Sequence, residues 1–254
     1  MIAAPRPPAV AERLNHYLAR HGVASRRGAD ALIEQGRVQL NGRPTRLGTL
    51  VEPAADHVTV DGRPIGEPVP LRTLVLNKPT GVVSTRRDPQ GRPTVLDLVD
   101  DPRGLSPVGR LDSDSRGLLL LSSDGDLALR VTHPRHGITK RYRATVTPHA
   151  TTAALRRITG GVALDDGDAR AQEAHLAGQD RRGNDVVEVV MAEGRKREVR
   201  RLFAAAGLRV VDLVRVAVGP VRLGRLKEGH ARPLTHAEER ALYEAVGLPP
   251  PRRR

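Results

Sequence analysis

The chain has 254 residues, which is enough for one large domain or two modest ones with a substantial core. Lysine and arginine number 42 against 29 aspartate and glutamate, so the formal net charge is +13 and a polyanionic partner such as RNA, DNA or anionic lipid is favoured. The absence of cysteine excludes disulfides, thiolate metal sites and thiol nucleophiles. No apolar run is long enough for a signal peptide or a membrane span, so we expect a cytoplasmic protein without membrane contact.

The first structured segment is expected to be a small α+β unit. Leu14, Tyr17 and Leu18 share the i, i+3, i+4 spacing of one helical face, and a second helix is expected to begin after Ser25, a residue type that caps helices. Short alternating strands follow at 38–40 and 58–60, ending in Asn-Gly and Asp-Gly turns typical of hairpins.

Basic residues gather in this unit. They are Arg13, Arg20, Arg26, Arg27, Arg37 and Arg43. By charge alone, a solvated face and an RNA contact are about equally favoured. The order of residues from Arg13-Leu14 through Ala24-Ser25-Arg26-Arg27 to 36–42 resembles the S4 RNA-binding domain, which implies RNA contact for Arg13, Arg20, Ser25, Arg26, Arg27 and Arg37.

Composition also suggests the domain limits. A Pro-rich segment at 1–9 is expected to be a disordered tail, and the S4-like unit should span 10–65. Three prolines and a glycine around positions 64–70 indicate a spacer, which we place at 66–72. A larger domain should span 73–247, followed by a basic tail at 248–254.

The most informative stretch of the larger domain is 109–126, GRLDSDSRGLLLLSSDGD. Four consecutive leucines, Leu118 to Leu121, closed by a polar turn, predict a strand that is buried on both faces. Asp112 lies just before this strand, on scaffolding rigid enough to hold a catalytic group. Taken alone, however, an aspartate at such a place more often caps a turn.

Other segments of the larger domain give a coarse secondary structure. Strands are expected at 74–78, 140–146, 186–191 and 208–218, and helices at 95–99, 126–132, 153–158 and 199–206. The chain has only four aromatic residues, and one of them, Tyr142, is framed by Lys140, Arg141 and Arg143. Packing in the core is the ordinary role of a strand tyrosine, whereas a ring framed by cations also suits a stacked nucleobase.

Taken together, these motifs resemble the pseudouridine synthases that modify ribosomal RNA. The resemblance implies that Asp112 is the nucleophile, that Tyr142 stacks on the target uracil and that Arg200 pairs with the catalytic acid. It also implies RNA contact for Lys78, Arg86, Arg110 and Lys140. The implied fold is α+β: a small S4 domain and a mainly antiparallel mixed sheet with flanking helices. The reaction needs no cofactor, because uridine isomerisation involves neither redox change nor loss of atoms.

Alternatives stay open at this stage. A non-catalytic RNA-binding or ribosome-assembly protein would share the S4 domain and the charge. Arg197-Glu198 in GRKREVRR is more like the synthase B group that acts on large-subunit (23S) ribosomal RNA, whereas the small-subunit (16S) type and some large-subunit types usually carry His-Gln. A metal site is not expected, because Pro134 separates His133 from His136 and no third ligand lies near. We expect a monomer whose partner is ribosomal RNA.

Overall fold

The computed structural model describes residues 11–251 and separates into two compact units, 1–70 and 71–254. The division falls inside the 66–72 spacer expected from the sequence. The expected tail at 1–9 and residues 252–254 of the basic tail lie outside the described residues. Within 11–251, the structure contains no helix with the length and apolarity needed to cross a membrane.

The first unit is built as the helix spacing and the hairpin turns predict. Its elements are β1 (Glu12–Arg13), α1 (Leu14–Arg20), α2 (Arg26–Glu34), β2 (Val38–Leu40), β3 (Arg43–Pro44), β4 (Leu50–Val51), β5 (Val58–Val60) and β6 (Arg63–Pro64). The Ser25 hydroxyl accepts a hydrogen bond from the Gly28 amide and caps α2. Asn41 and Gly42 both adopt positive φ, at 52° and 78°, which is the backbone of the tight turn predicted between β2 and β3.

The second unit is organised by a nine-stranded sheet. Its strands are β7 (Thr73–Lys78), β8 (Ser106–Val108), β9 (Arg116–Ser122), β10 (Lys140–Thr147), β13 (Glu173–Gln179), β14 (Asp185–Met191), β15 (Arg209–Val218), β16 (Val221–Arg222) and β17 (Ala231–Pro233). The main path runs β13-β14-β10-β15-β9-β7-β17. Only the β15–β9 pair in this sheet is parallel. The mainly antiparallel mixed sheet inferred from the resemblance is therefore confirmed.

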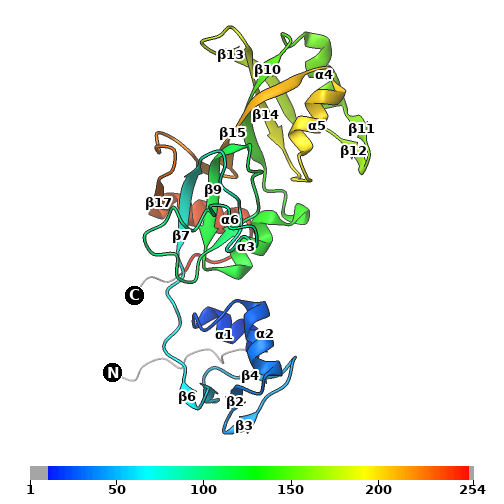
Figure 1. Cartoon of the computed structure of the whole chain (residues 1–254). Helices are drawn as coiled ribbons and strands as arrows, with labels where there is room; N and C mark the ends of the chain where they lie inside the picture. The colour runs from blue at the N-terminus through cyan, green and yellow to red at the C-terminus, as the bar shows by residue number, and fades with distance from the viewer. Residues whose placement is uncertain (1–10, 252–254) are drawn as a thin grey trace, which may run out of the picture. The chain divides into compact units, whose positions relative to one another are not determined.

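The leucines of β9 explain the two-layer packing around this sheet. Leu119 and Leu121 join the core cluster that includes α4 (Thr152–Gly160) and α5 (Glu198–Ala205), whereas Leu118 and Leu120 join the cluster that includes α3 (Gly125–Thr132) and α6 (His236–Ala245). Figure 1 shows the two helix pairs beside different parts of the sheet. Because successive strand residues point to opposite faces, a run of four leucines requires apolar cover on both.

The last helix is fastened by a buried polar contact. The Tyr243 hydroxyl of α6 donates to Asp124 Oδ2 at 2.6 Å, and Asp124 Oδ1 also accepts from the amides of Asp126 and Leu127 at the start of α3. Burial and the adjacent Asp124 carboxylate raise the pKa of Tyr243. One carboxylate thus caps α3 and anchors α6.

Some elements differ from the sequence-based expectation. The helix expected at 95–99 is a series of turns, because Asp97 Oδ2 accepts from both the Thr94 amide and the Thr94 hydroxyl and closes the chain locally. Several strands were not predicted, among them the edge strand β13, and neither was the helix α6. A short hairpin, β11 (Val162–Leu164) with β12 (Gly167–Ala169), lies between α4 and β13 in the chain.

Gly117 permits the close approach of β9 to β15. Its φ is +103°, and a Cβ at this position would lie 2.4 Å from the Arg215 carbonyl oxygen and 2.7 Å from the Arg215 nitrogen. We predict that Gly117→Ala lowers the free energy of unfolding by at least about 2 kcal/mol, because backbone atoms of a central strand cannot move aside. Urea denaturation measures this loss. Gly160→Ala is the control, since its Cβ would meet nothing within 4 Å; an equal loss in both variants would contradict the explanation.

Candidate active site

The loop that carries Asp112, residues 110–115, is held in place by hydrogen bonds to its backbone carbonyl groups. Each of its six consecutive carbonyl oxygens accepts a hydrogen bond. The donors, in order from residue 110, are Arg215 Nη1 (3.3 Å), Ser84 Oγ (2.8 Å), the Ser115 amide (3.0 Å), the Gly81 amide (2.8 Å), Arg200 Nη2 (2.9 Å) and Lys78 Nζ (2.8 Å). Apart from the Ser115 amide, which belongs to the loop itself, these donors come from other segments of the sequence, so the loop conformation depends on the assembled fold.

Lys78 lies beneath this loop. Its side chain is 0% exposed, and Nζ donates to the carbonyls of Ser115 and Pro79, each at 2.8 Å. Burial lowers the pKa of Lys78 to about 8, although the nearby Asp114 and Asp112 carboxylates oppose the shift. The RNA contact inferred for Lys78 is therefore wrong: the ammonium group is enclosed and holds the backbone.

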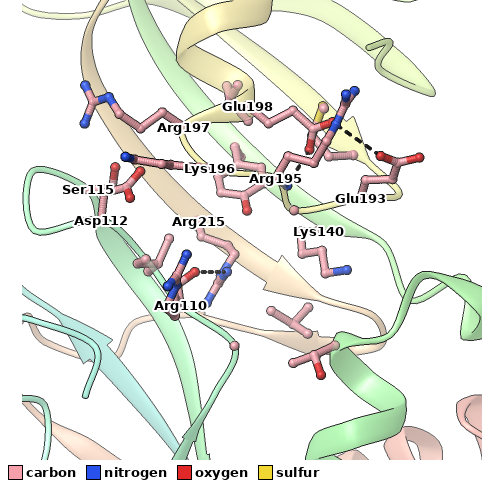
Figure 2. Close-up of a pocket in the computed structure, with 18 of the residues that line it drawn as sticks. Arg110, Asp112, Ser115, Lys140, Glu193, Arg195, Lys196, Arg197, Glu198 and Arg215 are labelled. Carbon is pink, nitrogen blue, oxygen red and sulfur yellow. Dashed lines mark hydrogen bonds and ion pairs between the residues drawn. The ribbon is translucent and has the colours of Figure 1, made fainter. Parts of the chain in front are cut away.

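Asp112 and Tyr142 line the same pocket, a hollow of about 330 Å³. Asp112 is half-buried, and its carboxylate forms no hydrogen bond or ion pair with any residue in 11–251. Tyr142 is 7% exposed and belongs to the core cluster, yet its hydroxyl also has no partner within this range. Figure 2 shows the hollow with Asp112 and Ser115 on one side and Lys140 on the other. An unpartnered carboxylate and an aromatic ring are thus available to a ligand.

The predicted pairing of Arg200 with Asp112 is wrong. Arg200 Nη2 donates to the Asp114 carbonyl and Nη1 to the Val210 carbonyl, each at 2.9 Å, and Nε lies 3.5 Å from Asp114 Oδ2. Asp114 also accepts from Arg197 at 2.9 Å. Although partial burial opposes the shift, Arg197 and Arg200 hold the pKa of Asp114 below its usual value. Arg200 therefore contacts the Asp112 loop at the neighbouring acid.

The sequence reasoning missed Arg215. This residue is 5% exposed, lines the pocket and stands opposite Tyr142 in the pairing of β15 with β10. Its Nε donates to the Leu118 carbonyl at 2.7 Å, and its Nη1 reaches the Arg110 carbonyl. An arginine within an otherwise apolar strand pattern, "DLVRVAV", was the available signal, because a buried guanidinium needs specific acceptors.

Lys140 lines the pocket on the same strand face as Tyr142, two residues away. Its Nζ has a weak contact with the Ala192 carbonyl at 3.4 Å, and burial together with the charge of Arg215 lowers its pKa. It is placed to face a ligand in the pocket.

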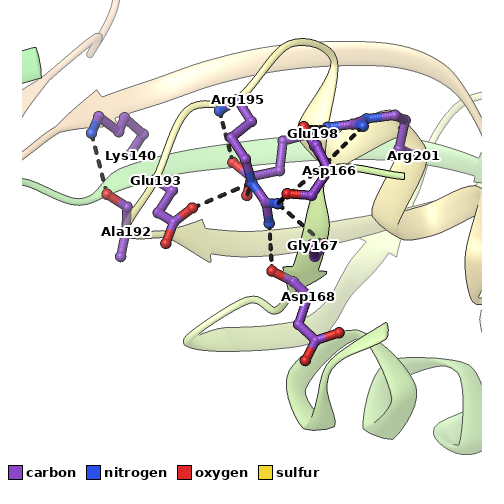
Figure 3. A network of polar contacts seen from close by, with 9 residues as sticks. All are labelled: Lys140, Asp166, Gly167, Asp168, Ala192, Glu193, Arg195, Glu198 and Arg201. Carbon is purple, nitrogen blue, oxygen red and sulfur yellow. Dashed lines mark hydrogen bonds and ion pairs between the residues drawn. The ribbon is translucent and has the colours of Figure 1, made fainter. Parts of the chain in front are cut away.

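The segment 193–198 forms another wall of the pocket. Arg197 adopts a left-handed backbone conformation with φ of 51° immediately before α5. Glu198 is 4% exposed and accepts from the Arg195 amide at 3.1 Å and from Arg195 Nε at 3.0 Å. Figure 3 shows how Arg195 joins this segment to the β11–β12 hairpin.

The remaining residues expected to bind RNA divide into two groups. Arg13, Arg26, Arg27, Arg86 and Arg110 are exposed, and their side chains form no polar contact within the described part of the chain. The others have partners: Arg20 pairs with Glu12, Arg37 pairs with Asp61 at 2.6 Å, and the Ser25 hydroxyl caps α2. Across residues 11–251, no group of three or more potential metal ligands is close enough to hold an ion.

Comparison with known proteins agrees with this fold. A family model described as RNA pseudouridylate synthase matches residues 72–205, and an S4 domain model matches residues 12–56. The chain is 42% identical to an RNA pseudouridine synthase of Aquifex aeolicus over 93% of this chain and 95% of that protein. It is 38% identical to ribosomal large subunit pseudouridine synthase B of Bacillus subtilis over 91% and 95%. A crystal structure of pseudouridylate synthase superposes with a TM-score of 0.64 at 31% identity, covering 91% of this chain and 99% of that one.

The fold and the site thus define an RNA-modifying isomerase that carries an S4 domain. The chain belongs to the RNA pseudouridine synthase family.

The enclosed Lys78 ammonium should make the free energy of unfolding depend on pH in the alkaline range. The folded protein releases this proton near pH 8, whereas the unfolded chain keeps it to higher pH. Between these values the unfolded state binds more protons, so the contribution of Lys78 to the free energy of unfolding rises with pH. We predict that the difference in unfolding free energy between the wild type and Lys78→Met grows by roughly 1–3 kcal/mol from pH 7 to pH 10. Urea titrations at each pH measure it; a similar growth with Lys227→Met, at an exposed position, would contradict it.

Proposed function

We propose that the protein converts a uridine of large-subunit (23S) ribosomal RNA to pseudouridine, with Asp112 as the nucleophile. The observation that carries this proposal is the Asp112 carboxylate, which has no protein partner although its loop is fixed at six carbonyl groups. A carboxylate whose loop is held in place, and which has no partner among residues 11–251, suits covalent catalysis, because it remains available to the substrate.

The reaction breaks the bond between uracil N1 and ribose C1′ and forms a bond between C5 and C1′. C5 loses a proton and N1 gains one, so atoms and electrons balance without a cofactor. Attack of Asp112 at uracil C6 and attack at C1′ are both compatible with a carboxylate in this position. The uridine has to leave its stack to enter the pocket, as in other enzymes that modify bases.

The other site residues support this chemistry in different ways. Tyr142 offers its ring to the base, and its hydroxyl is free to take part in the loss of the C5 proton. Arg200 positions the Asp112 loop through Asp114. The exposed arginines of the S4 domain, together with Arg86, Arg110 and Lys140, supply salt-sensitive phosphate contacts to the ribosomal RNA.

Two observations favour large-subunit RNA as the target. Relatives that match over most of their length are named ribosomal large subunit pseudouridine synthase B. This chain also has Arg197-Glu198 where the small-subunit type and some large-subunit types usually carry His-Gln. Mapping pseudouridine in 23S and 16S RNA after incubation with the protein tests this choice. Modification of 16S RNA alone would establish the small-subunit alternative. The cytoplasmic location and the monomeric state expected from the sequence stay predictions.

Replacing Asp112 with asparagine should abolish the reaction. We predict that Asp112→Asn lowers turnover by at least about a thousandfold, because an amide cannot act as the nucleophile, while RNA affinity changes little. Tritium release from C5-labelled uridine in rRNA measures turnover, and filter binding measures affinity. Asp126→Asn, an exposed aspartate of α3, should behave as the wild type. Substantial turnover by Asp112→Asn would refute the assignment.

Two substitutions at Tyr142 should separate the ring from its hydroxyl. Tyr142→Phe keeps the stacking surface and should retain much of the activity, whereas Tyr142→Ala should lose at least about tenfold, since one stacked base contributes roughly 1–3 kcal/mol. Steady-state kinetics on ribosomal RNA provide the comparison. If both variants lose activity equally, the hydroxyl is the essential group.

A further inference from the structure

A second hollow, of about 520 Å³, adjoins the active-site pocket. It is lined by the end of α4, the β11–β12 hairpin, and the segments around Arg170 and Ala192. The two hollows share three lining residues, Glu193, Arg195 and Glu198, so they lie on either side of one wall. Nothing in the chemistry described above uses this second hollow.

Arg195 joins this wall to the β11–β12 hairpin through several hydrogen bonds. Its guanidinium donates to the carbonyls of Asp166 and Gly167, each at 3.1 Å, and of Asp168 at 2.6 Å, in addition to its contacts with Glu198. Arg201 holds the Asp166 carboxylate from the other side at 2.8 and 3.0 Å. These contacts, drawn in Figure 3, fasten Arg195 to the β11–β12 hairpin, so its role is to shape the wall.

Besides Asp168, whose carboxylate forms no contact within residues 11–251, two polar side chains of the second hollow are free. Arg170 and Gln172 are exposed, line the hollow, and form no side-chain hydrogen bond or ion pair with residues 11–251. Their backbone is nevertheless fixed, because the intervening Ala171 amide donates to Ile158 at 2.9 Å and the Gln172 amide to Val190 at 2.8 Å. Ala169 and Ala171 are also buried, which anchors the segment further.

The chemistry of these two groups matches one ligand class. A guanidinium presents paired donors that suit a phosphate, and a carboxamide presents both a donor and an acceptor that suit the edge of a nucleobase. The carboxylates of Glu193 and Glu198 on the shared wall contact Arg195, at 3.3 and 3.0 Å, which screens their charge. Asp168 is the one acid of the lining that forms no ion pair within residues 11–251. The hollow is also in the size range of small-molecule sites.

We propose that this hollow is a subsite for the nucleotide that neighbours the target uridine in the RNA chain, with Arg170 on its phosphate and Gln172 on its base. The inference rests on the proposed function, since a neighbouring nucleotide can reach this hollow only if the target uridine occupies the adjacent active-site pocket. The subsite would let the enzyme read sequence directly beside the modified position, independently of the S4 domain.

The experiment pairs a protein substitution with a substrate substitution. Short RNA hairpins carrying the mapped uridine receive one neutral methylphosphonate at each phosphate within two nucleotides of that uridine. Dissociation constants are measured for the Asp112→Asn protein, which does not turn the RNA over, with and without Arg170→Ala. Arg181→Ala is the matched control, an exposed arginine of the β13–β14 turn that lies outside the hollow.

At one flanking phosphate we expect neutralisation to weaken binding about tenfold with Arg170 present and not at all with Arg170→Ala. Arg181→Ala should show the same tenfold loss as its parent. Gln172→Ala should reduce the preference among the four bases at that neighbouring position. The subsite would be refuted if neutralisation of every phosphate weakened binding by the same factor with and without Arg170→Ala. It would also be refuted if Arg181→Ala removed the tenfold loss as Arg170→Ala does. These results are separate from wild-type turnover, whose absence on either ribosomal RNA would instead overturn the proposed function.

Discussion

The site depends on the hydrogen bonds to the backbone of the Asp112 loop. Three of the six donors are cationic side chains, Lys78, Arg200 and Arg215, and all three act on carbonyl groups. Charge-assisted hydrogen bonds of this kind are stronger than neutral ones, and they surround the loop with positive potential. The loop is thereby fixed without consuming the negative charge of Asp112. The backbone of residues 110–115 fixes the position of Asp112, and the Asp112 carboxylate has no partner among residues 11–251.

This arrangement also explains why the cations are buried. A lone ammonium or guanidinium in a core is costly unless acceptors replace its water. Strand ends and loops expose carbonyl groups that no ladder satisfies, and the Asp112 loop offers six in a row. The buried cations therefore supply the donors that the loop carbonyl groups need, and the carbonyl groups supply the acceptors that the cations need. Removing Lys78 or Arg215 would leave both a void and unpaired carbonyl groups. The free acid of Asp112 is a consequence of this saturation.

Much of the fold followed from local sequence pattern. The leucine run at 118–121, the Asn41-Gly42 turn and the Ser25 cap were predictable because the signal lies within a few residues. The edge strand β13 was not, because its exposed residues carry no alternation. Asp112 and Tyr142 were identified by resemblance, whereas the contacts of Arg200 and Arg215 depend on segments about 85–105 positions apart. Pairing between a guanidinium and one particular carbonyl far away in the sequence cannot be predicted from the spacing of residues within a short segment.

The attachment of α6 through Tyr243 and Asp124 has a consequence during translation. A nascent chain that ends before residue 236 has α3 against this face of the sheet but lacks Leu242, Tyr243 and Val246, which complete the cluster around Val75, Leu118 and Leu120. Such a face is prone to aggregation and to capture by chaperones. The catalytic sheet thus becomes fully enclosed only when α6 has emerged from the ribosome, long after the S4 domain has been synthesised. On every newly made chain, the S4 domain is therefore complete before the second unit is.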